Sequence, residues 1–166
     1  MAAGSTYTPL ATNTLGSATS SVTFSSISGS YTDLFIVINS GSTASGQDIR
    51  CRFNSDSGSN YSLTYVTGNG SAASSGRSSS QTSMPLDYNG YLSGSIATTT
   101  IINCMNYSNT TTYKTILGRF NTAAFGTDMA VGLWRSTSAI TSIEFLTSAS
   151  TFLSGSTFTL YGIAAA

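Results

Sequence analysis

The stretch Leu34-Phe-Ile-Val-Ile38 decides the fold, because it is a short apolar run that lies between the polar residues Asp33 and Asn39. Aromatic and β-branched side chains favour extended backbone, and an apolar run of this length is typical of a strand. A strand with one solvent-exposed face alternates apolar and polar residues, whereas this run is apolar on both faces. We therefore predict a central strand that is buried on both faces.

The rest of the chain alternates apolar and polar residues in short segments, with Gly, Ser and Asn between them. Period-two alternation indicates strands, and helical periodicity is nearly absent. The segments with this pattern are 7–15, 21–26, 49–53, 61–65, 95–105, 113–120, 129–135, 140–147 and 156–163. About ten strands separated by turn signals predict an all-β protein, an antiparallel β-sandwich of jelly-roll type. We expect one domain over residues 1–166, with an extended N-terminal arm over residues 1–14.

Residues 69–83 interrupt this pattern, because they contain no large apolar side chain. The stretch is rich in Ser and Gly, and we predict a long mobile loop followed by a turn-rich connection up to Tyr91. Arg77, Tyr88 and Tyr91 are the larger side chains of this region. We predict that these three residues contact a partner.

The chain lacks most of the side chains that perform chemistry in enzymes. It has no His, and Glu144 is its only Glu. A Ser–His–Asp arrangement is therefore impossible, and no motif supports Lys114 as the base of a Ser–Lys pair. Glu144 lies between Ile143 and Phe145, so we expect it to point outward from a strand rather than to form a pair of catalytic carboxylates. The sequence predicts no enzyme, no catalytic residue, no cofactor and no metal site.

Charge and hydropathy exclude further classes of function. The formal net charge is zero and 7% of residues are charged, whereas a nucleic-acid-binding protein needs a basic surface. No apolar run approaches the length of a membrane span, and the first residues do not resemble a secretory signal. We predict neither nucleic acid nor a membrane as partner, and no secretion.

Two local patterns suggest sites but have simpler explanations. Cys51 and Cys104 lie in apolar strands, and they can pair if those strands are neighbours. We favour two buried thiols over a disulfide. The segment Asn54-Ser-Asp-Ser-Gly-Ser-Asn60 is rich in oxygen ligands, but Asp56 is its only carboxylate, so we expect a turn rather than a calcium loop.

Several aromatic residues are candidates for a platform on which a sugar stacks. They are Tyr88, Tyr91, Tyr107 and Trp134. In a β protein such residues more often pack in the core or in an interface.

Four segments resemble pieces that recur in small structural proteins of tailed bacteriophages. They are Phe24-Ser-Ser-Ile-Ser-Gly-Ser-Tyr-Thr-Asp-Leu34, Arg52-Phe-Asn-Ser-Asp-Ser-Gly-Ser-Asn-Tyr61, Tyr107-Ser-Asn-Thr-Thr-Thr-Tyr-Lys-Thr115 and Gly155-Ser-Thr-Phe-Thr-Leu-Tyr-Gly-Ile163. They occur in order along nearly the whole chain. The resemblance implies a β-sandwich component of the virion, of the kind that forms homotrimers on capsid surfaces or in fibres.

This resemblance implies a function of assembly rather than catalysis. We expect a capsid decoration (cement) protein or head fibre that binds and stabilises the major capsid protein lattice, in virions assembled in the host cytoplasm. The alternative is a tail- or neck-fibre module that binds a host-surface glycan. A third hypothesis is a hydrolase of capsule or cell wall that depends on Glu144. The resemblance assigns no site residues.

Overall fold

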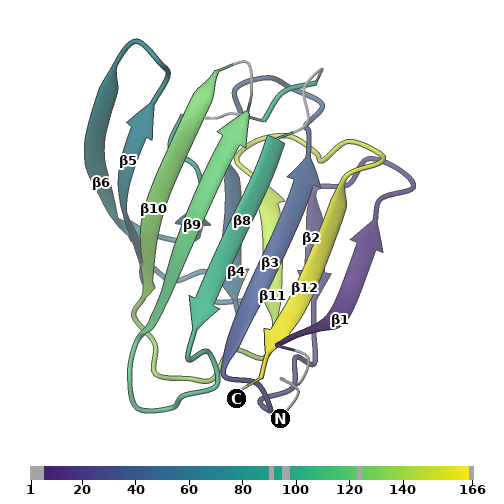
Figure 1. The fold of residues 1–166 in the computed structure, drawn as a ribbon, viewed down its shortest axis with the longest axis vertical. Coiled ribbons are helices and arrows are strands. Elements are labelled where there is room, and N and C mark those ends of the chain that lie inside the picture. The colour runs from purple at the N-terminus through teal and green to yellow at the C-terminus, as the bar shows by residue number, and fades with distance from the viewer. Residues whose placement is uncertain (1–5, 90–91, 95–97, 123–124, 165–166) are drawn as a thin grey trace.

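A computed structural model describes residues 6–89, 92–94, 98–122 and 125–164 of the chain. These residues form twelve strands in two antiparallel sheets and no helix (Figure 1). The structure confirms the all-β class and the antiparallel β-sandwich. The jelly-roll connectivity stays a prediction.

The larger sheet has eight strands in the order β1-β12-β3-β8-β9-β10-β5-β6. Their bounds are Tyr7–Thr14 (β1), Thr157–Ile163 (β12), Asp33–Ser40 (β3), Thr98–Met105 (β8), Lys114–Thr122 (β9), Gly126–Trp134 (β10), Tyr61–Gly68 (β5) and Ala73–Gln81 (β6). Each strand pairs antiparallel with its neighbours, and the register is continuous except for one irregularity in β1 and one in β5.

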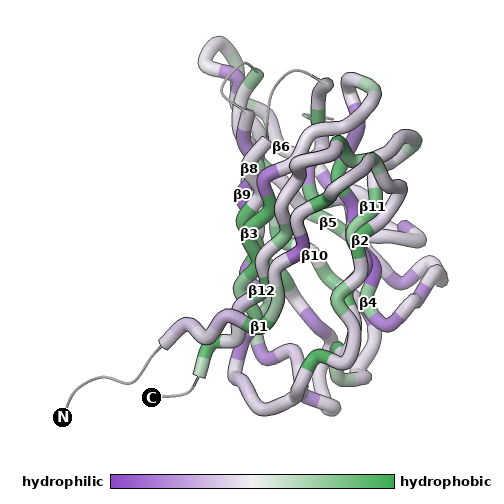
Figure 2. The backbone as a smooth tube through the Cα atoms, turned by 90° about the vertical axis from the view of Figure 1, so that its right-hand side faces the viewer, coloured by the Kyte–Doolittle hydropathy of each residue, from purple (hydrophilic) through white to green (hydrophobic). Residues whose placement is uncertain are grey.

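The smaller sheet covers one side of the larger sheet. Its four strands, in spatial order, are β2 (Ser21–Phe24), β11 (Ile143–Thr147), β4 (Ile49–Phe53) and β7 (Met84–Pro85). Figure 2 shows the sandwich edge-on, with β3, β8 and β9 in one layer and β2, β4 and β11 in the other. The larger sheet therefore has one covered face and one outward face.

The hydrophobic core lies between the two sheets and is rich in aromatic rings. Phe158 of β12 lies 5.8 Å from Phe145 of β11 and 5.0 Å from Phe152, measured between ring centroids. Phe53 of β4 lies 5.5 Å from Trp134 of β10. These contacts join the layers, because each fully buried aromatic side chain contributes about 1.5–3 kcal/mol to folding.

The predicted central strand is present, but the prediction that both of its faces are buried is wrong for this chain. In β3, Leu34, Ile36 and Ile38 are buried in the core. Phe35 and Val37 point to the outward face of the larger sheet and are only half-buried. The reason is that the smaller sheet covers one side of the larger sheet and no described strand covers the other.

The prediction of a long mobile loop over residues 69–83 is also wrong, because Ala73–Gln81 form the edge strand β6. This strand pairs with β5 through backbone hydrogen bonds, with Val66 opposite Ser75 and Thr64 opposite Arg77. Its side chains are mostly small and exposed, so apolar alternation is absent from the sequence. The turn before it is closed by the Asn69 side chain, which accepts hydrogen bonds from two backbone amides that follow it.

The part of the predicted N-terminal arm that the structure describes belongs to the sandwich. Residues 7–14 form β1, which pairs antiparallel with β12 along its whole length. Residues 1–5 lie outside the described residues.

Candidate functional site

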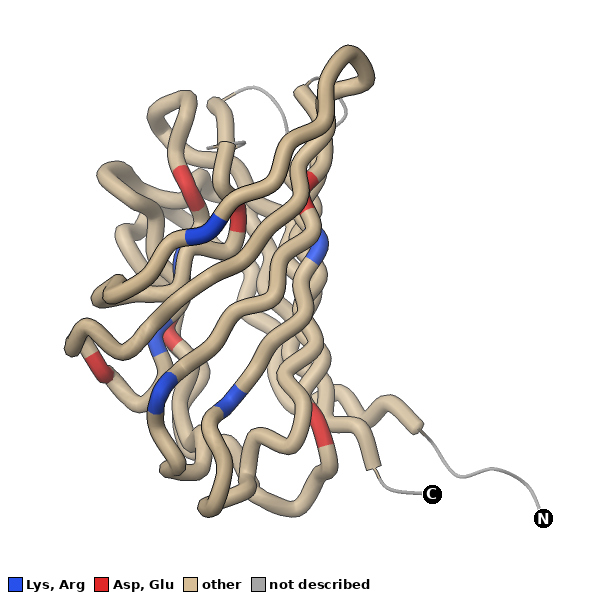
Figure 3. The backbone as a smooth tube through the Cα atoms, turned by 90° about the vertical axis from the view of Figure 1, so that its left-hand side faces the viewer, with Lys and Arg blue, Asp and Glu red and all other residues tan. Residues whose placement is uncertain are grey.

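Among the described residues there is no cluster of three or more His, Cys, Asp or Glu side chains able to hold a metal ion. Glu144 points outward from β11, as predicted, and its carboxylate lies 3.6 Å from the guanidinium of Arg52. None of the described residues forms a helix long and apolar enough to span a bilayer. Figure 3 shows that the charged residues are scattered rather than gathered into one patch.

Lys114 is the one buried amine in the described part of the chain, and its contacts are those of a residue that stabilises the fold. Its Nζ donates to the carbonyl oxygen of Thr112 at 2.8 Å and to that of Thr137 at 3.2 Å. Burial lowers the pKa of this amine, and the nearby Cys104 opposes that effect. These bonds tie the turn before β9 to the segment that follows β10.

Asp56 organises the turn between β4 and β5. Its carboxylate accepts hydrogen bonds from Trp134 Nε1 (2.7 Å), Asn60 Nδ2 (2.9 Å) and the backbone amide of Gly58 (2.8 Å). Partial burial alone would raise the pKa of Asp56, but these three donors outweigh it and lower the pKa. Both carboxylate oxygens serve the turn, which agrees with the interpretation of this segment as a turn rather than a calcium loop.

Cys51 and Cys104 are free thiols buried in the core. Burial raises the pKa of both: the pKa of Cys104 rises to about 12, and that of Cys51 lies well above its ordinary value. A thiol is a poor nucleophile and metal ligand under these conditions, since the thiolate is the reactive form.

The three predicted partner-contact residues do not form one surface. Arg77 is exposed on β6 opposite Thr64, so it points to the outward side of the larger sheet. Tyr88 is 49% exposed and stacks on the buried Tyr65, at 3.8 Å between ring centroids, on the opposite side of the β5–β6 hairpin. Tyr91 lies outside the described residues.

The candidate sugar-stacking residues are also separated. Trp134 and Tyr107 are buried and belong to the core. Of the four candidates, Tyr88 is the one that the structure describes as exposed.

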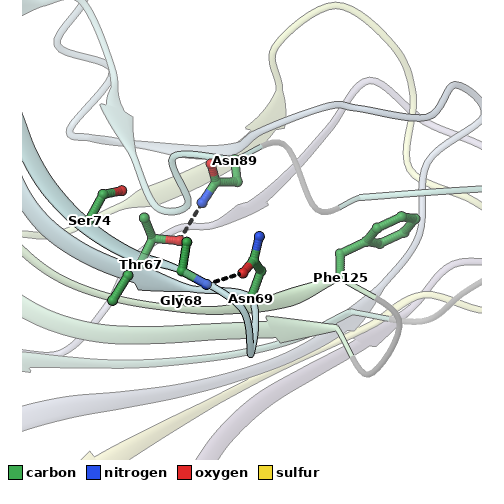
Figure 4. Close-up of a pocket in the computed structure, with 8 residues that line it drawn as sticks. Thr67, Gly68, Asn69, Ser74, Asn89 and Phe125 are labelled. Atoms are coloured by element: carbon green, nitrogen blue, oxygen red, sulfur yellow. Dashed lines mark hydrogen bonds between the residues drawn. The ribbon is translucent and has the colours of Figure 1, made fainter.

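A polar pocket of about 220 Å³ lies at one end of the larger sheet, between the β5–β6 turn and the segment around Asn89 (Figure 4). Asn89 Nδ2 donates to Thr67 Oγ1 at 2.5 Å and to Asp128 Oδ1 at 3.1 Å. Phe125, which is 54% exposed, lines the same pocket. Hydroxyl and amide groups beside an exposed aromatic ring are the chemistry that a sugar needs.

The outward face of the larger sheet, which we call the outer face, carries several exposed apolar side chains. The exposed apolar side chains on it, in strands β5, β8, β9 and β10, are Val66, Met105, Leu117, Met129 and Val131. Each of these side chains is between 40% and 58% exposed. Figure 1 looks onto this face, and no other described strand lies in front of it.

Strand β10 shows how unusual the outer face is. Its buried positions hold Asp128, Ala130, Gly132 and Trp134, whereas Met129 and Val131 face outward. Gly132 leaves room for the core side chains beside it, because a Cβ there would lie 2.1 Å from Met84 Sδ and 2.8 Å from Ile116 Cγ1. The larger aliphatic side chains of this strand therefore lie on the open side.

The outward face of the smaller sheet is different. Its strands present Thr23, Arg50, Arg52 and Glu144 with one apolar residue, the partly buried Leu146, and Arg50 forms an ion pair with Asp48 at 2.9 Å. That face has the composition of an ordinary solvated surface. Sequence reasoning missed the outer face, although the apolar run 34–38 and the side chains of β10 were signals of it.

Comparison with known protein families found no family model that matches this chain, and no curated protein matches it either.

Proposed function

We propose that this chain is a non-enzymatic structural protein of a tailed-bacteriophage virion. More specifically, we propose a capsid decoration (cement) protein or head fibre. Such a protein binds the major capsid protein as a homotrimer and stabilises the capsid lattice. The proposal rests on the resemblance of four segments in order along the chain. The observation on the structure that carries it is the broad apolar outer face, which is a surface suited to assembly.

The other features of the site support the same class of function. Glu144, Lys114 and Asp56 each have a structural partner, and the two thiols are buried. A β-sandwich with extensive hydrogen bonding between its strands suits a protein that must persist outside a cell. Assembly into a symmetric oligomer also covers exposed sheet edges such as β6.

The test is binding of the purified protein to phage capsids that lack it. We expect saturable co-sedimentation with capsids and a higher temperature of capsid disruption, because a bound bridging protein stabilises the lattice by mass action. Bovine serum albumin at the same concentration is the control for trapping in the pellet. Absence of binding to capsids, together with binding to isolated tails, would contradict the decoration role.

The alternative, a tail- or neck-fibre module that binds a host glycan, is favoured by one observation, the polar pocket lined by Asn89, Thr67 and Phe125. Under this alternative a glycan array gives a positive signal that Phe125→Ala abolishes. Tyr113→Ala is the matched control, since Tyr113 is 56% exposed and does not line the pocket. No glycan signal for the wild-type protein removes this alternative.

A further inference from the structure

We infer that the outer face packs against the outer face of a second copy of this chain. This inference rests on self-assembly in the proposed function and refines its oligomeric state, because a contact between identical faces joins two copies rather than three. In this arrangement the polar face of the smaller sheet lies on the outside of the assembly.

The first argument is the pattern of strand β3. Five consecutive apolar residues are typical of a strand that is covered on both sides. Within one chain only Leu34, Ile36 and Ile38 are covered, and Phe35 and Val37 face outward. A second copy on the outer face completes the burial that this sequence pattern indicates.

The second argument is that apolar side chains extend across the sheet in two adjacent rows, each interrupted by one polar residue. One row of paired residues, from β10 to β12, contains Val131, Leu117, Asn103, Phe35 and Tyr161. The adjacent row, from β5 to β3, contains Val66, Met129, Arg119, Ile101 and Val37. These rows form one band rather than scattered single residues, and scattered residues are what an ordinary surface shows.

The third argument is area. Tyr7 of β1 extends the band, because its ring lies 5.4 Å from that of Phe35 and 6.4 Å from that of Tyr161. With Tyr7 the band crosses the seven strands from β1 to β5, which at about 4.8 Å per strand is about 34 Å wide. Met105, two residues beyond Asn103 on β8, adds a third row, so the outermost rows lie about 13 Å apart along the strands. With side chains included the band extends about 20 Å in this direction, so its footprint is about 700 Å². A stable interface of standard size covers about 600–1,000 Å² of each partner, so the footprint of the outer face lies within the range that holds a second copy.

The fourth argument is charge complementarity. Arg119 lies in the band and makes no ion pair with any described residue. Asp33 lies on the same face, at the start of β3, and is likewise without an ion pair to a described residue.

These two charges lie on opposite sides of β8 and toward opposite ends of it. Arg119 is opposite Ile101, whereas Asp33 precedes Leu34, which is opposite Cys104. A rotation axis in the interface near Asn103, which lies between them, brings Arg119 of one copy toward Asp33 of the second copy. Opposite charges placed in this way fix the register of an otherwise apolar interface.

The experiment measures the oligomeric state of the full chain by sedimentation velocity, with Leu117→Asp as the perturbation. Leu117 is 43% exposed at the centre of the band, so an Asp there places an unpaired charge in the interface and leaves the monomer core intact. We expect the concentration for half-dissociation to rise about 100-fold or more. The matched control is Asn121→Asp, which adds the same charge to the same face of β9 outside the band and is expected to leave assembly unchanged.

A charge exchange tests the register. Arg119→Asp and Asp33→Arg are each expected to weaken assembly, and the double variant is expected to recover it. Near-wild-type thermal unfolding of each variant confirms that it is folded, which matters because Asp33 also accepts a hydrogen bond from the Asn106 amide at 2.7 Å.

A wild-type protein that is monomeric at its highest soluble concentration would overturn the inference. So would an oligomer that Leu117→Asp leaves intact. Capsid binding is measured separately, so an oligomer that does not bind capsids contradicts the proposed function and leaves this inference standing.

Discussion

The turn around Asp56 gives the sharpest prediction of stability. Asp56→Ala removes the acceptor for three hydrogen bonds, from Trp134, Asn60 and Gly58. Trp134 is 2% exposed, so its Nε1–H is left buried without an acceptor, at a cost of about 1–3 kcal/mol. The other two donors belong to a more exposed loop and can turn to water, at a cost of about 0.5 kcal/mol or less each. The expected loss in the free energy of unfolding is about 2 kcal/mol, which lowers Tm by about 4–8 °C.

The assay is urea unfolding followed by the fluorescence of Trp134, the only Trp in the chain. The matched control is Asp48→Ala, which breaks the partly exposed ion pair with Arg50 and is expected to cost between 0 and about 1 kcal/mol. Equal losses for the two variants would refute the reasoning, because they would show that the burial of the Trp134 donor has no energetic consequence.

The same carboxylate makes stability depend on pH. The pKa of Asp56 is lower in the folded protein than in the unfolded chain, where it is about 3.9. Its contribution is therefore complete above pH 5, and it is lost as the pH falls through the folded pKa. Asp56→Asn, which retains an acceptor but does not titrate, is expected to flatten the unfolding free energy between pH 5 and pH 3. An unchanged pH profile would contradict the assignment.

Two further predictions concern the core. Cys51 and Cys104 are expected to resist Ellman's reagent at pH 8 in the native protein and to react fully in denaturant without reductant, because both are buried free thiols. A rapid reaction of the native protein, or no reaction after unfolding, would contradict this prediction. Gly162→Ala is expected to cost about 1–3 kcal/mol, because its Cβ would lie 2.4 Å from the Tyr31 ring. Gly16→Ala, with no atom within 4 Å of the new Cβ, is the control, and equal unfolding free energies for the two variants would refute the packing argument.

The sequence predicted the strands whose side chains alternate against the core. Val22 with Phe24, and Phe158 with Leu160, are apolar at alternate positions because they face the opposite sheet, and all four are buried. Strand β6 escaped prediction for the opposite reason. Its backbone pairs with β5, but its small side chains have no layer to pack against.

The orientation of β10 was also beyond the sequence pattern. From Met129 onward both sets of alternate residues are apolar, and the inward set, which also includes the buried Asp128, is the one that contains Gly132. Met84, a residue distant in sequence, occupies the space beside Gly132, and the short-range pattern of β10 does not contain this contact. The apolar run 34–38 and the side chains of β10 indicated that some strands have two apolar faces, but only the orientation of β10 shows that Met129 and Val131 point away from the core.

The partner-contact residues Arg77, Tyr88 and Tyr91 were chosen for their size in a stretch of small residues. The size of a side chain does not depend on which face of the sheet the backbone directs it to. The structure puts Arg77 and Tyr88 on opposite sides of one hairpin, so a single partner surface does not include both.

The most direct test of the central claim is an electron cryo-microscopy map of intact virions that carry this chain. The account predicts density for the β-sandwich at regular positions over the capsid lattice, in symmetric oligomers whose copies meet through their outer faces. Density for the chain confined to the tail or neck would contradict the decoration role.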